Sequence, residues 1–391
     1  MDKSSIFKLS FWKVVGIVIV VSGLYATYLR FTEGLGAVTN LSDSFPWGLW
    51  IGFDILCGVG LAAGGFTICA VTHIFNIEKF KPLTRPAILT AFLGYLLVVF
   101  ALLIDLGRPY YIWHAIIMWN PHSVMFEVAW CVMLYSTVLF LEFAPVVLER
   151  FKMNKLLMVL RRVLVPIMIL GILLSTLHQS SLGSLYLIIP SKMHPLWYTA
   201  LLPVNFYISA IATGFAMVIF EAYLSARAFG HGIKLELLSK IAVVSLFALL
   251  LNIIIKIVDL TFSGKLHYLT VFSTEVILYW SELILGTVVP VILLANKKFR
   301  ESRLWLYISS IFIIAGFLMN RLNVSVTSIT AQTGFQYFPS IHEILITSMI
   351  VVLGMWAFKL IIKNFPVFQE DEESAVEKKY FLKGNEIIVS E

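Results

Sequence analysis

The sequence has 391 residues, of which 59% are apolar and 13% charged, and its mean hydropathy is +0.90. Soluble domains carry about 25% charged residues, so this composition excludes a soluble protein and predicts a multi-pass membrane protein. The net charge of +6 includes no basic stripe with interleaved aromatic residues, which argues against nucleic-acid binding. Three cysteines (Cys57, Cys69 and Cys131) lie in apolar stretches without a CxxC pair. This pattern excludes an iron–sulfur cluster or structural zinc bound by this chain alone.

Ten stretches have the apolar length of about 20 residues that a membrane-spanning helix needs. Backbone polar groups cannot remain unpaired in lipid, so these stretches are predicted to be helices. Their predicted limits are 12–30, 47–76, 86–104, 123–143, 163–178, 200–226, 239–260, 272–295, 304–320 and 344–362. The expected fold is an all-α polytopic membrane protein. Its transmembrane domain covers residues 1–366, and the charged tail 367–391 is predicted to be disordered and cytoplasmic.

The orientation follows from the distribution of Lys and Arg. Of the 29 basic residues, 23 fall at the N-terminus, in every second loop and in the tail. The other side has only Arg30, Arg108, Lys192, Lys256, Lys265 and Arg321. The positive-inside rule therefore predicts that both termini are cytoplasmic, which requires an even number of spans, and ten is even.

The loops predicted to be extracytoplasmic are rich in histidine and aromatic residues. They are Arg30–Pro46, Asp105–His122, His178–Tyr198, Thr261–Val271 and Arg321–Glu343, and they contain six of the eight histidines. Exposed apolar surface marks interaction sites, so these loops are interpreted as a docking surface for an extracytoplasmic partner. A simple interfacial aromatic belt is the alternative.

The second span opens with an unusual stretch, from Phe45 to Asp54. A proline and two tryptophans, Trp47 and Trp50, stand at the predicted membrane boundary, and a carboxylate follows inside the span. Gly60 and Gly64 have the spacing that lets helices approach closely. An ionisable residue in a span marks a functional site by default, so Asp54 is a candidate; a hydrogen bond to a neighbouring helix is the structural alternative.

A weak internal repeat links the two halves of the chain. Residues 63–66 (Ala-Gly-Gly-Phe) recur as 212–215 (Ala-Thr-Gly-Phe), and Glu127-Val128 recurs as Glu275-Val276. The members of each matching pair are separated by almost the same number of residues, 149 and 148. This suggests two four-helix bundles with two peripheral helices, a parallel repeat of the kind seen in membrane carriers. Biased apolar sequences also produce such matches by chance.

The ionisable groups of the spans fall at several depths. Asp54, Asp105, Glu127, His178, Lys256, Asp259 and Glu275 lie toward the outside, Glu282 nearest the middle, and His73, Glu142 and Glu221 toward the cytoplasm. Lys256 and Asp259 are three residues apart and are expected to pair with each other. Groups at successive depths are what a proton path requires, and its candidates are Glu127, Glu142, Glu221, Glu275, Glu282 and His73. Any polar bundle interior would show the same pattern.

A transmembrane b-type haem needs two axial histidines at matching depth on facing helices. Only His73 and His178 lie within the predicted spans, and the predicted topology places them at opposite membrane faces. The chain is therefore expected to bind neither haem nor a metal ion. The stretch His178–Ser184 ends the fifth span, where His178 could hydrogen-bond a carbonyl oxygen and exchange a proton; its serines could equally cap a short outer helix.

Several stretches occur together and in order: Phe45–Asp54, Asp105-Leu-Gly-Arg108, Ser123-Val-Met-Phe-Glu127, Glu142-Phe-Ala-Pro145, His178–Ser184, His194-Pro-Leu-Trp197 and Tyr337-Phe-Pro339. As a set they resemble the NrfD-like (polysulfide reductase) family of integral membrane subunits, and most closely its ten-span branch in hydrogenase-2-type complexes. The resemblance covers nearly the whole chain. It implies a quinone-reactive subunit docked to an extracytoplasmic iron–sulfur protein, with a quinone site near the outer face. The family pattern matches at Asp54, Arg108, Glu127 and His178.

The expected function is electron exchange between menaquinone, or another quinone, and a periplasmic four-cluster-type iron–sulfur partner in the bacterial inner membrane. Asp54, Glu127 and His178 would handle protons, and Trp47 and Trp50 would line the quinone ring. Arg108, also a candidate quinone-binding residue together with Asp54 and His178, would hold an acidic group of a partner or the Asp105 carboxylate. The catalytic module beyond could be a hydrogenase, a molybdoenzyme or a multihaem cytochrome.

Two other functions remain open: a secondary transporter with a midplane site, and a structural anchor for a periplasmic enzyme. The absence of a clearly broken span argues against the transporter. Loss of quinone-linked activity on removal of Glu127 would argue against the anchor.

The topology is directly testable with reporter fusions at Glu391. We expect activity from reporters that work in the cytoplasm and none from reporters that work only after export, because the basic loops stay inside. The opposite pattern would contradict both the charge count and the even number of spans.

Overall fold

The computed structural model describes residues 11–230 and 232–368, which form helices joined by loops and contain no strand. Within these residues, ten helical spans are long and apolar enough to cross a membrane. They are Phe11–Thr32, Trp50–Ile74, Glu78–Asp105, Val124–Arg150, Asn154–Leu187, Leu202–Phe229, Leu235–Phe262, Thr274–Ala295, Arg303–Thr333 and Ile341–Asn364. This confirms the predicted fold class, whereas nearly all of the predicted tail lies outside the described residues.

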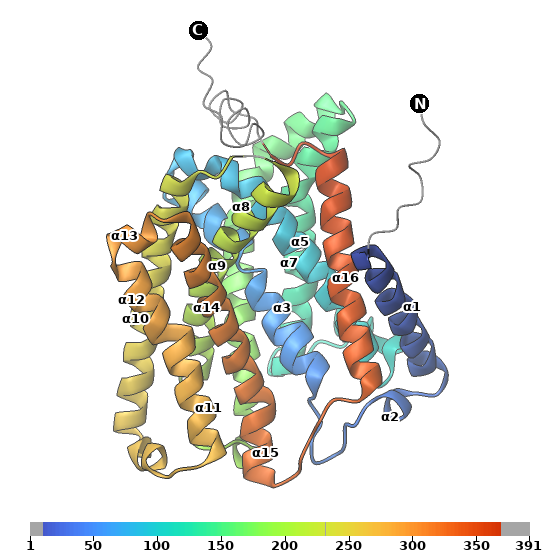
Figure 1. Cartoon of the computed structure of the whole chain (residues 1–391). Helices are drawn as coiled ribbons and strands as arrows, with labels where there is room; N and C mark the ends of the chain where they lie inside the picture. Colours follow the sequence, from blue (N-terminus) through green and yellow to red (C-terminus); the bar gives the residue numbers. More distant parts are fainter. Residues whose placement is uncertain (1–10, 231, 369–391) are drawn as a thin grey trace.

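The eight central spans form two four-helix bundles (Figure 1). Bundle A is residues 50–187; its helices are α3 (Leu56–Leu61), α4 (Gly64–Cys69), α5 (Lys81–Asp105), α7 (Val124–Arg150) and α8 (Asn154–Leu187). Bundle B is residues 202–333; its helices are α9 (Leu202–Phe229), α10 (Leu235–Phe262), α11 (Thr274–Leu283), α12 (Val289–Ala295), α14 (Arg303–Leu322) and α15 (Ser328–Thr333). The bundles meet where α3, α4 and α8 pack against α9 and where α14 packs against α3.

The first and last spans, α1 (Phe11–Thr32) and α16 (Ile341–Asn364), pack along each other, and α16 attaches the pair to α5. Figure 1 shows them together at one side of the molecule. The pairing is close, because a Cβ on Gly23 would lie 2.4 Å from the Cβ of Met349. These are the two peripheral helices that the sequence predicts.

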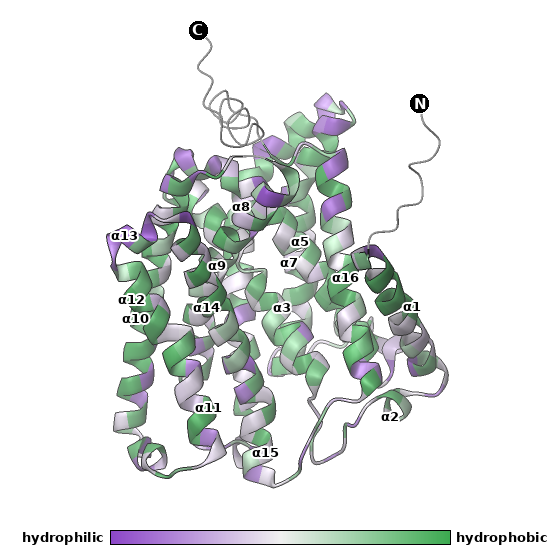
Figure 2. Cartoon of the chain, viewed as in Figure 1, coloured by the Kyte–Doolittle hydropathy of each residue, from purple (hydrophilic) through white to green (hydrophobic). Residues whose placement is uncertain are grey.

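The spans begin and end at two opposite faces. We call outer the face formed by loops 33–49, 106–123, 188–201, 263–273 and 334–340, and inner the face where α1 begins and α16 ends. Small helices decorate both, among them α2 (Leu35–Val38) and α6 (His114–Ile117) on the outer face and α13 (Lys297–Arg300) on the inner face. Hydrophilic residues gather at α13 and the inner helix ends, whereas the span sides are hydrophobic, as a bilayer requires (Figure 2).

Most of the described spans are longer than predicted, and in two of them the difference moves polar residues from the predicted outer loops into the bundles. α8 runs to Leu187, so His178 lies inside the helix and the following serines do not cap an outer one. The ninth span runs to Thr333, so Arg321 is 1% exposed inside bundle B instead of lying in an outer loop. Polar residues inside these helices made the hydropathy fall before the helix ended.

Three of the described spans contain local irregularities, although each continues as one helical span. The second span contains π-helical segments at Trp50–Ile55 and Ala70–Ile74 and a tight turn between α3 and α4. Further π-helical segments interrupt span eight at Ile284–Val288 and span nine at Asn323–Thr327. Hydrogen bonds such as Ala63 N–H to the Gly60 carbonyl oxygen continue through the turn, at 3.1 Å. Because the backbone stays paired, these are local kinks and not the unwound segments of a transporter site.

The repeat is visible in the architecture. Spans starting at residues 50, 78, 124 and 154 recur at 202, 235, 274 and 303, about 150 residues later. The repeated tetrapeptides, 63–66 and 212–215, pack against each other where the bundles meet. A Cβ on Gly214 would lie only 2.8 Å from the carbonyl carbon of Ala63, so this contact requires glycine.

Replacing Gly214 with alanine should therefore loosen the contact between the bundles. We expect Gly214→Ala to destabilise the fold by about 1–3 kcal/mol, the usual cost of overpacking, and to lower the unfolding temperature of the protein purified in mild detergent. Gly36→Ala is the matched control, because a Cβ there meets nothing within 4 Å. Equal unfolding temperatures for Gly214→Ala and the unmodified chain would show that the contact is not tight.

Candidate functional site

One stretch of α8 connects the whole of bundle A. The Nδ1 atom of His178 lies 2.8 Å from the Tyr95 hydroxyl on α5. The side-chain amide of Gln179 donates to the Val59 carbonyl on α3, at 3.0 Å. Ser181 reaches Glu127 on α7. Three residues within four positions thus contact the three other spans of the bundle, and His178, Gln179 and Ser181 are all at most 1% exposed.

Glu127 is the most accessible member of this group. It lies in the first turn of α7, after the N-cap Ser123, and is partly exposed at the outer end of the bundle. The Ser181 hydroxyl lies 2.5 Å from Glu127 Oε1 and 2.7 Å from the Leu177 carbonyl oxygen. A hydroxyl has one proton to donate. When that proton goes to Leu177, a protonated Glu127 can donate to Ser181; when Glu127 is ionised, Ser181 can donate to it.

The interior behind Glu127 contains polar atoms without a hydrogen-bond partner. Among the described residues, these include His178 Nε2 and the hydroxyls of Tyr135, Ser175 and Tyr186. Tyr135 packs edge-on against Tyr95, with the ring centroids 4.6 Å apart. Buried polar groups are almost always hydrogen-bonded, so these atoms mark the inside of bundle A as an unusually polar interior.

Asp54 faces away from this interior. Its Oδ2 accepts a hydrogen bond from Thr347 on α16, at 2.7 Å, so it joins the second span to the peripheral pair. This is the structural role that the sequence left open as the alternative. The structure therefore does not place Asp54 beside His178 and Glu127, and its predicted role in proton transfer stays a prediction.

The two tryptophans have different environments. Trp47 is half-buried and packs edge-on against Tyr186 of α8, with centroids 5.3 Å apart, so it borders bundle A. Trp50 is buried, with its indole N–H directed at the Glu343 carbonyl 3.4 Å away. The backbone between them is held by Tyr337, whose hydroxyl accepts from Leu49 N–H at 2.8 Å and donates to the Glu343 carboxylate. Of the two, Trp47 lies against α8 and Trp50 lies against α16.

The expected contact between Arg108 and Asp105 is wrong. Arg108 is exposed in the outer loop, whereas Arg30 of α1 lies within electrostatic reach of Asp105. Arg30 also donates to the backbone carbonyl oxygens of Ile104, at 2.7 Å, and of Leu106. These two residues lie at the C-terminal end of α5, where helix carbonyl groups lack partners within the helix. Arg108 thus remains free to meet an acidic group of a partner.

The six residues predicted to form a proton path do not lie along one continuous path. Glu127 and the buried Glu142 belong to bundle A, and Glu221 accepts a 2.5 Å hydrogen bond from Thr90 across the bundle interface. The other three are dispersed: His73 lies at the inner end of the second span beside Thr72, Glu275 at the outer end of bundle B, and Glu282 inside bundle B.

Burial lowers the pKa of His194 in the outer loop, and the Glu275 carboxylate acts against that shift.

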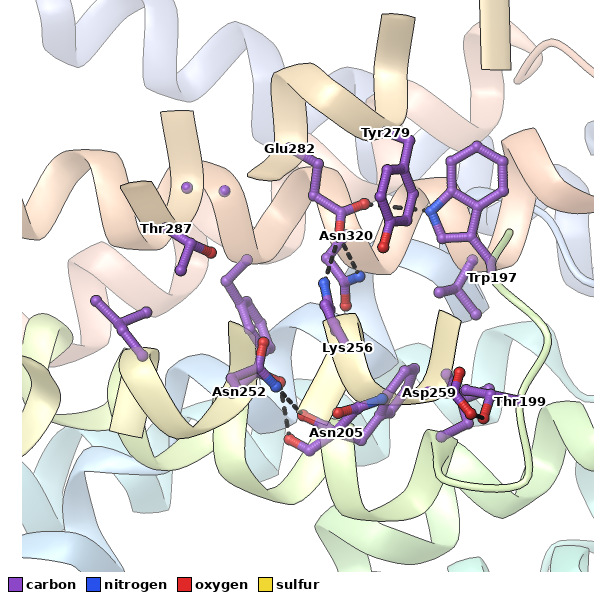
Figure 3. Close-up of a pocket in the computed structure, with 18 of the residues that line it drawn as sticks. Trp197, Thr199, Asn205, Asn252, Lys256, Asp259, Tyr279, Glu282, Thr287 and Asn320 are labelled. Atoms are coloured by element: carbon purple, nitrogen blue, oxygen red, sulfur yellow. Dashed lines mark hydrogen bonds and ion pairs between the residues drawn. The ribbon is translucent and has the colours of Figure 1, made fainter. Parts of the chain in front are cut away.

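The expected pair of Lys256 and Asp259 is replaced by a different one. Lys256 Nζ lies 2.7 Å from Glu282 Oε1, and Asp259 accepts from Thr199 at 2.8 Å (Figure 3). Spacing on one helix could not reveal this pairing, because α11 supplies Glu282. Glu282 and Lys256 line a cavity in bundle B together with several asparagines. In the sequence, a lysine and asparagines inside apolar spans were the signal that could have indicated this polar cavity.

Comparison with known proteins gives extensive similarity. A family model described as "Polysulphide reductase, NrfD" matches residues 37–331. The chain is 34% identical over 347 residues to the probable Ni/Fe-hydrogenase 2 b-type cytochrome subunit of Escherichia coli, covering 86% of this chain and 87% of that protein. It is 28% identical over 403 residues to the menaquinone reductase integral membrane subunit of Nitratidesulfovibrio vulgaris, covering 95% of each. A third relative from the same organism, described only as "Protein", is 40% identical over 368 residues, covering 91% of this chain and 94% of its own length.

The name of the Escherichia coli relative, a b-type cytochrome subunit, raises the question of haem. His178 lies in the outer half of α8, fully buried against Tyr95, and His73 lies near the inner face. His342, in the first turn of α16, belongs to the peripheral pair. These histidines do not form the axial pair that a b-type haem needs, and the described residues contain no cluster of three potential metal ligands.

We therefore predict that the purified chain shows no haem absorption and no iron. The measurement is a reduced-minus-oxidised spectrum together with metal analysis of the isolated subunit. A stoichiometric b-type spectrum would show that these histidines are arranged differently in the membrane.

Proposed function

The chain belongs to the NrfD (polysulphide reductase) family of integral membrane proteins, and we propose on this basis that it is the quinone-reactive subunit of a respiratory oxidoreductase complex. The names of its relatives support this proposal, since they include a menaquinone reductase subunit and an Hdr-like menaquinol oxidoreductase subunit. Menaquinone or a related quinone is the proposed substrate.

The observation that carries the proposal is the Glu127–Ser181 contact at the outer end of bundle A. It joins a partly exposed carboxylate to the buried polar stretch of α8. Trp47, which packs on the buried Tyr186, lies at the same end of the bundle and offers ring surface for a quinone headgroup. The site thus combines an apolar wall with a group that can bind a proton.

Oxidation of a quinol releases two electrons and two protons, and reduction of a quinone takes up the same number. Glu127 would accept or supply one proton at the quinone oxygen, with Ser181 as its hydrogen-bond partner in either state. The His178–Tyr95 pair lies deeper and would handle the second proton. Asp54 and Arg108 stay proposed contributors, although neither contacts this group in the structure.

The electrons would pass to or from an iron–sulfur protein on the outer face. The loop after α5 supports such docking, since Tyr110, Trp113 and Trp119 are 48–66% exposed beside α6. Large exposed aromatic residues mark interaction surfaces. The proposed partner is a periplasmic four-cluster-type iron–sulfur protein coupled to a hydrogenase, a molybdoenzyme or a multihaem cytochrome, in the bacterial inner membrane with both termini of this chain in the cytoplasm.

Proton movement across the membrane is part of the proposal for bundle A. Glu142 lies buried between α7 and α8 on the inner side of His178, close enough that a Cβ on Gly171 would be 3.0 Å from its Oε1. Glu221 and His73 lie nearer the inner face. These groups, with Glu127, Glu275 and Glu282, remain candidates for carrying protons.

The proposal is tested by Glu127→Gln, which keeps the size and the hydrogen bonding of Glu127 but removes its titration. We expect the complex to assemble and quinone-coupled turnover to fall by about 100-fold or more, the usual contribution of a general acid–base group. Glu127→Asp should retain part of the activity. Assembly is measured by co-purification and turnover by quinone reduction in membranes.

Glu33→Gln is the matched control, because Glu33 is an exposed carboxylate at the outer end of α1. It should turn over at the unmodified rate. An unmodified rate in Glu127→Gln would remove Glu127 from the mechanism and favour the structural-anchor function.

A further inference from the structure

The turn that joins α7 to α8 at the inner face carries more positive charge than its own carboxylate balances. We call residues 149–162 the α7–α8 hairpin. Its one carboxylate is Glu149, and its five cations are Arg150, Lys152, Lys155, Arg161 and Arg162. Glu149 Oε1 already lies 2.9 Å from the Nη2 atoms of both Arg85 and Arg161. Among the described residues, no carboxylate lies within ion-pair distance of the other four cations.

The other described loops of the inner face each contain a local ion pair. Lys81 pairs with Glu78, Lys240 with Glu236 and Lys297 with Glu301. In each pair the glutamate is three or four residues from the lysine, so both side chains lie on the same surface. The four remaining cations of the α7–α8 hairpin have no such neighbour. Their field therefore attracts an anion from outside the chain.

The α7–α8 hairpin also exposes large apolar side chains beside these cations. Phe151, Met153, Leu156, Met158 and Val159 are 49–65% exposed. Basic and apolar residues that alternate on one surface are typical of segments at the boundary between lipid headgroups and acyl chains. At that boundary the apolar side chains leave water while the cations stay among polar groups.

A stripe along α8 shows where the acyl chains begin. Its residues are spaced three or four positions apart and are all exposed: Leu156, Val159, Val163, Pro166, Leu170, Leu173 and Leu177. This spacing places them on one face of the helix. From Leu156 to Leu177 the helix rises about 32 Å, and the hydrocarbon core of a bilayer is about 30 Å thick. The stripe therefore fits the acyl-chain region, and Lys152 and Lys155 lie at the level of the inner headgroups.

The two arginines that follow Leu156 extend back toward this level. Nη2 of Arg162 lies 3.9 Å from Sδ of Met158, which is one turn nearer the inner end of α8. Arg161 reaches Glu149 at the inner end of α7. Long basic side chains lay their methylene groups on apolar surface and place their charge among polar groups. Arg162 also shares a face of α8 with Lys155, which lies seven residues earlier.

From this arrangement we propose that the α7–α8 hairpin binds an anionic phospholipid of the leaflet at the inner face. The phosphate lies among Lys152, Lys155 and Arg162, and the acyl chains lie along the stripe that begins at Leu156. Basic clusters beside membrane spans recognise anionic headgroups, and charge-assisted hydrogen bonds to phosphate are strong. The site lies on the lipid-facing surface of bundle A and depends on neither the quinone chemistry nor an electron-transfer partner.

The test compares lipid binding by purified complexes that differ only in cations of the inner face. The hairpin variant carries Lys152→Gln, Lys155→Gln and Arg162→Gln. The matched control carries Lys81→Gln, Lys240→Gln and Lys297→Gln, which remove the same charge from the same face but from lysines that pair with glutamates. Phosphatidylglycerol and phosphatidylcholine are added in equal amounts in mild detergent, and bound lipids are counted by native mass spectrometry.

We expect the unmodified complex and the control to bind phosphatidylglycerol in preference to phosphatidylcholine. The hairpin variant should bind about fivefold less phosphatidylglycerol or less still, since removal of even one basic residue beside an anionic headgroup has an effect of that size. Phosphatidylglycerol binding that is unchanged in the hairpin variant, or reduced equally in the control, would overturn the proposal.

A charge-conserving variant separates lost charge from a disturbed fold. It carries Lys152→Arg, Lys155→Arg and Arg162→Lys, and it should keep the preference for phosphatidylglycerol. Loss of the preference in this variant as well would show that the charges do not hold the lipid, and would contradict the proposal.

Glycerol phosphate tests whether the acyl chains contribute, because it has the phosphate but no chains. At the same concentration as the lipid it should leave phosphatidylglycerol bound, whereas complete displacement would show a site for free phosphate and overturn the lipid proposal. Glu127→Gln should bind phosphatidylglycerol as the unmodified complex does, so a failure of the lipid site is distinguishable from a failure of the proposed quinone chemistry.

Discussion

Bundle A is held together by the hydrogen bonds that His178, Gln179 and Ser181 make from α8 to the three other spans. In a bilayer the hydrophobic effect does not favour one helix contact over another, so close packing and interhelical hydrogen bonds decide which helices meet. The same three side chains define the bundle and place the proposed proton-transfer groups. Replacing His178 or Ser181 would therefore be expected to disturb both the packing of bundle A and one of the proposed proton-transfer groups.

The two bundles share an architecture but differ in the surroundings of their central ionisable residues, His178 and Glu282. Bundle A has polar atoms without partners around His178, whereas in bundle B the carboxylate of Glu282 accepts four hydrogen bonds. Unsatisfied buried groups are costly and persist where a ligand or a proton supplies the missing partner. The contrast separates the polar interior of bundle A, where the proposed quinone chemistry would take place, from the ion pair of Lys256 and Glu282 in bundle B.

The number of spans, the fold class and the pairing of bundles follow from the sequence because each depends on hydropathy and repetition alone. The limits of α8 and of the ninth span do not, because buried polar residues such as Gln179 and Arg321 lower the local hydropathy inside a helix that nevertheless continues. The hydrogen bond of Asp54 to Thr347 could not be predicted from the sequence either. Which helix a side chain faces depends on the packing of α16 against the second span, and no local pattern encodes that contact.

The contact between residues 63–66 and 212–215 joins corresponding positions of the two halves of the chain. A surface that meets its own copy is what a two-fold symmetric dimer has. The arrangement is therefore that of two four-helix units that meet through corresponding surfaces within one polypeptide. The polar residues inside the two units nevertheless differ. One now presents a histidine and a carboxylate near the outer face, and the other a lysine with its counter-ion.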